Sequence, residues 1–259
     1  MERYPHLWAA LLAVRRGTEV LAAQSPQAAA TSGSSGPMSS AEYERPVEEA
    51  ILTELDRHFP EQAVIAEESA PEFATKPRWI VDPLDGAVNY RNGVPHYSIS
   101  IAFESRQTRD VGVVYYGPTE TVFTAVEGEG AFADGVALSV SETRSVSNAL
   151  VATGFDPMTM AAQDLTQFRA FIDRTQGVRR FGSAAAELSM VAAGYFDVFF
   201  ERMLRVWDTA AGTLLVAEAG GEVTRIERLD GDNSEMVLAS NPHIHQELVS
   251  LVSGGSSSV

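Results

Sequence analysis

The apolar residues of the first sixty positions recur at helical spacing in two separate blocks. Four apolar residues of the first block, which opens with MERYPHLWAALLAVRRG, share one helical face: Leu7, Leu11, Val14 and Leu21. Three residues of the second block, which ends near His58-Phe59-Pro60, do the same: Val47, Ile51 and Leu55. The stretch between the blocks, residues 22–40, is rich in Gly, Ser, Ala and Pro. The pattern therefore predicts two amphipathic helices joined by a surface loop.

Short apolar runs predict strands in the rest of the chain. Two of them end in acidic residues: AVIA at 63–66 is followed by Glu67, and WIV at 79–81 by Asp82. Sheet-like runs follow at 97–105, 109–117 and 120–126, and then a turn-rich hairpin region at 127–135. Later strands are expected at 150–155, 195–201, 221–227 and 236–240, with helices around 159–175, 184–193, 208–219 and 242–252. Strands that alternate with helices predict a layered arrangement of sheets and helices.

Composition and charge exclude several classes of protein. With 35 acidic and 19 basic residues the formal net charge is -16, which argues against non-specific nucleic-acid binding. The absence of cysteine excludes disulfides, thiol catalysis and cysteine zinc sites. No window is apolar enough to predict a membrane span, and the N-terminus carries Arg15 and Arg16 after its apolar residues, unlike a signal peptide. A cytoplasmic protein is expected. Its excess acids are either a solvated surface or, in part, metal ligands.

Four carboxylates stand where elements begin or end. Glu67 and Asp82 each follow a predicted strand, Asp85 lies in the turn after Asp82, and Asp208 opens a predicted helix in VWDTAAG. Magnesium prefers a few such carboxylates together with water and phosphate, and the carbonyl of Leu84 could complete a coordination sphere. A structural interpretation competes, because Asp is common in turns and as a helix N-cap. Taken one at a time, these residues favour the structural interpretation.

Several segments together resemble one known family. They are AEES at 66–69, DPLDGAVNY at 82–90, GVVYYGPTETVFTAVEGEGAFADG at 112–135, FGSAAAEL at 181–188 and VWDTAAG at 206–212. In this order they resemble the inositol monophosphatase family, part of the magnesium-dependent, lithium-sensitive phosphatase superfamily. The resemblance implies an α+β fold, a layered α-β-α-β-α sandwich of the inositol monophosphatase and fructose-1,6-bisphosphatase type. It also implies an N-terminal α+β half at 1–148, a C-terminal α/β half at 149–254 and a flexible tail at 255–259.

The resemblance also implies roles for individual residues and an activity. Two Mg²⁺ ions would be held by Glu67, Asp82, the carbonyl of Leu84, Asp85 and Asp208, and the four carboxylates would be catalytic. The implied substrate contacts are Asp85, Gly86, Ala87, Ser183, Ala184, Glu201 and Asp208. The implied activity is hydrolysis of a small phosphate monoester by an activated water, in a homodimer that binds neither nucleic acid nor membrane.

The chain departs from the family pattern at two places. Ala87 stands where the family usually has Thr or Ser, so a hydroxyl beside the metals is lost. Glu44 falls where the family has an aspartate that supports a third, weaker metal, and the preceding loop lacks the usual lysine. A weakened enzyme that acts through binding or assembly is therefore the alternative. Other substrates also stay open: histidinol phosphate, a sugar bisphosphate or 3'-phosphoadenosine 5'-phosphate.

Overall fold

The computed structural model of the chain describes six stretches: residues 4–24, 39–69, 76–105, 108–155, 162–227 and 234–253. Most of the loop expected at 22–40, and the expected tail, lie outside these residues. The helices are α1 (Pro5–Ala23), α3 (Ser40–His58), α4 (Ala87–Arg91), α5 (Ala162–Arg174), α6 (Ala184–Ala192), α7 (Val206–Glu218) and α8 (His245–Ser253). Two single 3₁₀ turns are η1 (Gly117–Thr119) and η2 (Val146–Asn148).

Twelve strands form two sheets within the described residues. The first sheet has the order β1-β2-β3-β4-β5-β6-β7, parallel between β1 and β2 and antiparallel elsewhere. Its strands are β1 (Ala63–Ala66), β2 (Arg78–Asp85), β3 (Ser98–Glu104), β4 (Arg109–Tyr116), β5 (Thr121–Val126), β6 (Gly130–Ala133) and β7 (Val136–Ala137). The second sheet has the order β11-β12-β10-β8-β9. Its strands are β8 (Leu150–Thr153), β9 (Gly177–Arg179), β10 (Val198–Leu204), β11 (Glu222–Glu227) and β12 (Glu235–Ser240).

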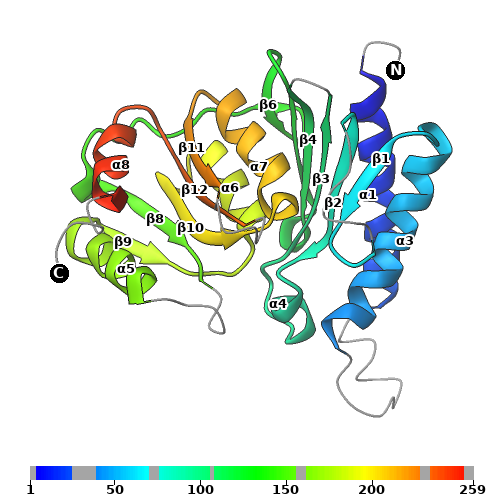
Figure 1. The fold of residues 1–259 in the computed structure, drawn as a ribbon, viewed down its shortest axis with the longest axis horizontal. Coiled ribbons are helices and arrows are strands. Elements are labelled where there is room, and N and C mark those ends of the chain that lie inside the picture. The colour runs from blue at the N-terminus through cyan, green and yellow to red at the C-terminus, as the bar shows by residue number, and fades with distance from the viewer. Residues whose placement is uncertain are drawn as a thin grey trace.

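The sheets and helices stack in five layers. Helices α1 and α3 pack together on one face of the first sheet, and α6 and α7 lie between the two sheets (Figure 1). Helices α5 and α8 cover the outer side of the second sheet. The layered α-β-α-β-α sandwich expected from the sequence is confirmed. The division into halves at residue 148 stays a prediction.

The outer helices bury the faces that their sequence patterns predicted. Val47, Ile51 and Leu55 of α3 are fully buried. In α1, Val14 and Leu21 are buried, Leu7 and Leu11 are partly buried, and the small residues Ala9 and Ala13 complete the buried face. Helix α3 begins at a capping box, in which the Ser39 amide donates to the Glu42 carboxylate at 2.5 Å. Both helices therefore form where local signals and burial agree.

Helix α7 is buried almost all round because its small residues let the sheet approach closely. Gly112 of β4 faces Ala211 of α7, and a Cβ added at Gly112 would stand 2.9 Å from the Ala211 carbonyl oxygen. That oxygen belongs to a helix backbone and has little freedom to move. The sequence of α7 is apolar around its whole circumference, which suits a helix placed between two sheets.

We expect Gly112→Ala to destabilise the protein by about 1–3 kcal/mol, because the added methyl group forces α7 away from β4. The matched control is Gly177→Ala in β9, where the nearest atom is the mobile end of Arg179 at 3.2 Å. Chemical denaturation of both variants checks this. Equal stability of the two variants would contradict the close contact between α7 and β4.

Several predicted boundaries were wrong. β10 begins at Val198 rather than 195, because residues 193–197 turn the chain back after α6 and Asp197 accepts hydrogen bonds from Ser141 Oγ (2.6 Å) and the Leu150 amide (2.6 Å). The three-residue strand β9 was not predicted, since it is too short for an alternating pattern. The described part of the predicted helix around 159–175 is α5, Ala162–Arg174.

Candidate active site

Strand β2 does not end before Asp82, as the sequence had predicted, but includes it. The sequence predicted a turn at 82–85, but β2 continues to Asp85 through an irregular pairing in which Asp82 lies opposite Ser100 and Asp85 opposite Ser98. Pro83 has no amide hydrogen for the ladder, and the Leu84 amide turns to donate to Asp82 Oδ1 at 3.0 Å. Two carboxylates thus stand at a bulge of an internal strand, paired on both sides by β1 and β3, which holds them more rigidly than a turn would.

Gly86 then reverses the chain into the short helix α4. Its φ is +88°, and a Cβ there would lie 3.0 Å from the His96 carbonyl oxygen and 3.2 Å from that of Gly182. Only glycine fits both the left-handed conformation and the crowding. Ala87 is the first residue of α4 and is 9% exposed, so its side chain points into a confined space.

Asp85 links the first sheet to α6 in the middle layer. Its Oδ2 accepts hydrogen bonds from Ser183 Oγ and the Ala185 amide, both at 2.7 Å, and from Ser98 Oγ at 3.2 Å. Burial raises the pKa of Asp85 even though these donors favour its charged form. Three predicted site residues, Asp85, Ser183 and Ala184, are therefore brought together at the start of α6.

Asp208 lies in the first turn of α7. It is the third helical residue rather than the predicted N-cap, because the helix begins at Val206, and its Oδ2 accepts the Arg205 amide at 2.7 Å. Burial and the negative charge of Asp85 raise the pKa of Asp208 to about 7. That electrostatic effect places the two aspartates in one site.

Glu67 reaches the same site from β1. Because β1 pairs in parallel with β2, with Ala66 opposite Val81, the residues that follow both strands are neighbours. Glu67 and Asp82 influence each other's pKa, which indicates that their carboxyl groups lie close together. Part of Glu67 is exposed, yet the burial of its carboxyl group and the charges of Asp208, Glu44 and Asp85 raise its pKa to about 8.

Glu44 approaches this group from α3. It is 6% exposed, and burial together with the charges of Glu68 and Glu48 raises its pKa to about 7. Glu48 was not recognised in the sequence. It accepts the Glu68 amide at 2.8 Å and the Ser69 hydroxyl, and so holds the chain that follows β1. An acid buried on the inner face of an otherwise amphipathic helix was the available signal.

Two further acids stand on the side of the second sheet. Burial and the charges of Glu187, Asp208 and Asp85 raise the pKa of Glu201, and Arg180 opposes this rise. Glu187 was missed by the sequence reasoning. It accepts the amides of Phe181 (3.2 Å) and Gly182 (2.9 Å), and burial raises its pKa to about 8. Its signal was a single acid in the apolar helix α6.

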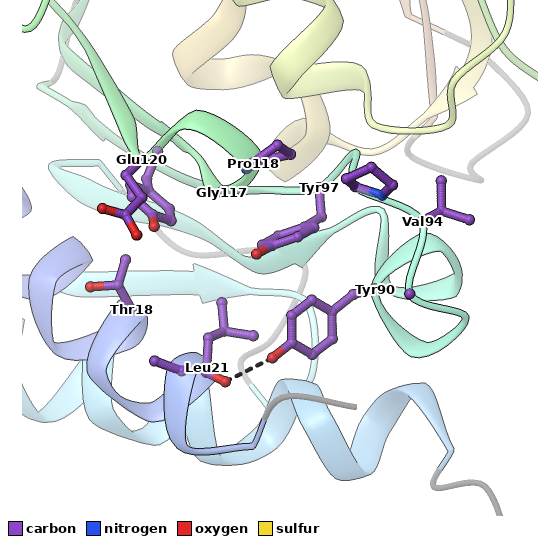
Figure 2. A pocket seen from close by; sticks show the side chains of 12 residues that line it. Thr18, Leu21, Tyr90, Val94, Tyr97, Gly117, Pro118 and Glu120 are labelled. Atoms are coloured by element: carbon purple, nitrogen blue, oxygen red, sulfur yellow. Dashed lines mark hydrogen bonds between the residues drawn. The ribbon is translucent and has the colours of Figure 1, made fainter. Parts of the chain in front are cut away.

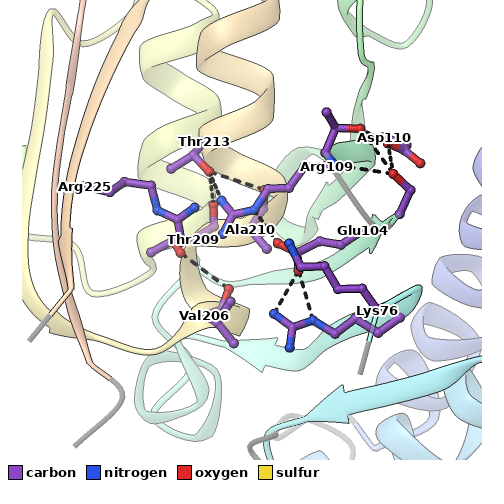
Figure 3. Close-up of polar contacts among 12 residues, drawn as sticks. Lys76, Glu104, Arg109, Asp110, Val206, Thr209, Ala210, Thr213 and Arg225 are labelled. Atoms are coloured by element: carbon purple, nitrogen blue, oxygen red, sulfur yellow. Dashed lines mark hydrogen bonds and ion pairs between the residues drawn. The ribbon is translucent and has the colours of Figure 1, made fainter. Parts of the chain in front are cut away.

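A buried polar network fixes the helix that carries Asp208 (Figure 3). Glu104 of β3 accepts Arg109 Nε at 2.9 Å, and Arg109 Nη1 donates to Thr213 of α7 at 2.5 Å. On the next turn of α7, Thr209 donates to Glu235 of β12, which also pairs with Arg225 at 2.6 Å. The network ties α7 to both sheets, so the position of Asp208 depends on the whole middle layer.

Glu67, Asp82, Asp85 and Asp208, here called the acid cluster, carry charges that no ion pair among the described residues neutralises, although the charge of Arg205 opposes the rise in the pKa of Asp208. In the part of the chain that the structure describes, none of the four forms an ion pair with Lys, Arg or His. Burial raises the pKa values of all four, and repulsion by other members of the cluster adds to the rise for Glu67, Asp82 and Asp208. Hard oxygen donors with excess negative charge are the chemistry that suits Mg²⁺.

The side chains of the acid cluster are not arranged as the ligands of a metal ion. Among the described residues, no three acidic or histidine side chains already stand together in a way that could hold an ion. Asp82, Asp85 and Asp208 are instead turned toward backbone amides and hydroxyls. The donor set fits a divalent cation, and binding requires these side chains to rotate toward it.

The comparison with known proteins agrees with the fold and the motifs. A model of the inositol monophosphatase family matches residues 7–256. The chain belongs to the inositol monophosphatase family. This confirms the resemblance, and with it a phosphatase-like fold, while the role of each site residue stays a prediction.

Relatives within this family carry two kinds of name. The chain is 39% identical over 212 residues to an inositol-1-monophosphatase of Rhizobium meliloti, with 79% of each chain covered. It is 36% identical over 214 residues to a Nus factor SuhB of Haemophilus influenzae, again with 79% of each covered. The structure of an inositol monophosphatase from Anabaena sp. PCC 7120 superposes with a TM-score of 0.84 at 30% identity, covering 98% of this chain and 97% of that one.

No described helix combines the length and the apolar character that crossing a bilayer requires.

Proposed function

We propose that this protein hydrolyses a small phosphate monoester in a magnesium-dependent reaction. The observation that carries the proposal is the acid cluster: four carboxylates from β1, β2 and α7 with raised pKa values and no ion-pair partner among the described residues. Such an arrangement disfavours folding unless a cation or protons neutralise it. Family membership supports magnesium as that cation.

In this proposal Asp82, Asp85, Asp208 and Glu67, with the Leu84 carbonyl, hold two Mg²⁺ ions. Bound Mg²⁺ would acidify a water and stabilise the charge on the leaving alkoxide. Glu67 would orient the attacking water and accept its proton, since it directly follows β1 beside the strand that carries Asp82. Glu44 supports a third and weaker ion.

The substrate lies between the two sheets. The backbone amides of Gly86 and Ala87, at the start of α4, donate to phosphate oxygens in this proposal. Ser183, Ala184 and Glu201 face the alcohol part, and Glu201 accepts hydroxyl protons from it. Residues of the first sheet thus bind phosphate and those of the second sheet select the alcohol.

Phosphate release from a panel of monoesters tests the proposal. The panel includes inositol 1-phosphate, histidinol phosphate, fructose 1,6-bisphosphate and 3'-phosphoadenosine 5'-phosphate, each with millimolar Mg²⁺ and with EDTA. We expect release from at least one substrate with Mg²⁺ and none with EDTA. If no substrate of the panel releases phosphate at saturating Mg²⁺, the enzymatic proposal is refuted.

Ala87→Thr is expected to raise turnover by about tenfold or more, because it restores a hydroxyl near the attacking water. The matched control is Ala87→Val, which has the same shape without the hydroxyl. Steady-state kinetics of the three proteins checks this. Equal rates for the Thr and Val variants would show that the hydroxyl has no role.

A second candidate is binding or assembly with little turnover. Two observations favour it: Ala87 lacks the usual hydroxyl, and close relatives are named Nus factor SuhB. Binding or assembly becomes the better proposal if no substrate of the panel releases phosphate while Mg²⁺ still binds to the acid cluster. Homodimer formation, lithium inhibition, a cytoplasmic location and the absence of nucleic-acid binding stay predictions from family membership and charge.

A further inference from the structure

A second pocket lies on the α1 side of the first sheet, and none of the acid cluster lines it. Its volume is about 290 Å³, and its lining comes from the end of α1, α4 with the segment that follows it, β4 and η1. Figure 2 shows Tyr90 and Tyr97 facing Leu21 across the opening, with Glu120 on the side toward which the Tyr97 hydroxyl points. The lining combines three tyrosines with one carboxylate, that of Glu120.

Aromatic rings form a fixed wall of the pocket. The rings of Tyr90 and Tyr97 meet edge to face, with centroids 4.8 Å apart. Tyr90 donates its hydroxyl to the Leu21 carbonyl at 2.7 Å, which ties it to the end of α1. Tyr97 lies so close to Gly117 that a Cβ there would be 2.0 Å from its ring. The rings are therefore held in place before any ligand arrives.

Glu120 supplies a solvent-exposed carboxylate beside this wall. It has a left-handed backbone, with φ at 57°, and its side chain forms no hydrogen bond or ion pair with any described residue. Burial raises the pKa values of Tyr97 and Tyr115, the latter to about 12, and the charge of Glu120 contributes to both. The carboxylate therefore stands near both phenols.

The remaining polar groups of the pocket also favour a positively charged ligand. Among the residues that the structure describes, no Lys, Arg or His lines the pocket, and the hydroxyls of Tyr97 and Tyr115 have no hydrogen-bond partner. The carboxyl end of a 19-residue helix, α1, adds partial negative charge. Aromatic faces attract cations as well. A bare metal ion would need more oxygen ligands than one carboxylate, whereas Leu21 and Pro118 offer contacts to an apolar stem.

We propose that this pocket binds a small organic cation, an alkylammonium group whose nitrogen faces Glu120 and the tyrosine rings and whose short chain contacts Leu21 and Pro118. The ammonium donates hydrogen bonds to the carboxylate and the free hydroxyls. Nothing in the site requires the acid cluster or magnesium, so the pocket is independent of the proposed phosphatase activity.

Calorimetric titration with n-butylammonium in EDTA tests the proposal, with n-butanol as the neutral and butyrate as the anionic counterpart. We expect saturable binding of n-butylammonium, binding at least about tenfold weaker for butanol, and none for butyrate. Equal affinity for butanol and n-butylammonium, or no binding of n-butylammonium at tens of millimolar, would overturn the proposal.

Variants identify the charge responsible. Glu120→Gln should weaken n-butylammonium binding by about tenfold, because a charged hydrogen bond becomes neutral. Glu127→Gln is the matched control, since Glu127 is an exposed acid in the neighbouring β5–β6 turn that does not line the pocket. If both variants weaken n-butylammonium binding equally, the effect comes from net charge alone and the site is refuted. Binding unchanged in Asp82→Asn would separate it from the acid cluster.

Discussion

Asp82→Asn and Asp208→Asn are each expected to lower magnesium-dependent phosphate release by on the order of a thousandfold or more, because each removes a charged ligand from the proposed metal site. Both residues sit on rigid elements, the bulge of β2 and the first turn of α7. The amides of Leu84 and Arg205 can still donate to an asparagine oxygen, so local structure is retained.

The free energy of unfolding, measured without metal, separates lost chemistry from lost folding. Without metal, the Asn variants should be at least as stable as the parent, since each relieves repulsion among buried carboxylates. The matched control is Asp56→Asn, the same change at an exposed residue of α3 whose side chain forms no hydrogen bond or ion pair with the described residues. Retained activity in Asp82→Asn or Asp208→Asn would refute the assignment of the ligands.

The second large effect is a linked dependence of stability on pH and magnesium. Burial and mutual repulsion hold the pKa of Glu67 at about 8 and that of Asp208 at about 7 in the folded protein, well above their values of 4.5 and 3.8 in an unfolded chain. At a pH between the unfolded and the folded pKa of each group, the folded state binds more protons than the unfolded state. The stability of the metal-free protein should therefore fall as the pH rises from about 5 to about 8.

Magnesium should reverse that loss where the carboxylates are ionised. At a concentration of 100 times Kd it would raise Tm by about 5–10 °C near pH 8 and by much less near pH 5.5. Thermal unfolding across this range, with Mg²⁺ or with EDTA, measures the effect. Asp208→Asn should both flatten the pH dependence in EDTA and shrink the magnesium shift. A stability in EDTA that rises from pH 5.5 to pH 8 would contradict the proposed charge burial.

The sequence predicted the parts of the site that depend on local order. Glu67 and Asp82 directly follow short apolar runs, and parallel pairing of β1 with β2 is enough to bring them together. The helical faces of α1 and α3 were readable because amphipathic periodicity reports burial directly. The motifs themselves were sufficient to predict the family, which the family model confirms.

Contacts between distant segments could not be read in the same way. Asp85 is bonded to Ser183, 98 residues away, and that pairing depends on α6 lying between the two sheets. Glu187 looked like one acid among many until burial placed it near Asp85 and Glu201. The bulge in β2 was invisible too, because Asp-Pro-Leu-Asp suits a turn as well as an interrupted strand.

By itself, then, the sequence determined the family, the layered fold and the order of the acids, since these follow from local pattern and motif. The tertiary structure alone decided which acids share a buried volume, how far each is from a ready ligand geometry, and that Glu120 stands free beside a wall of tyrosines. The physical reason is that charge repulsion and burial depend on distance in space, and residues far apart along the chain acquire that distance only on folding.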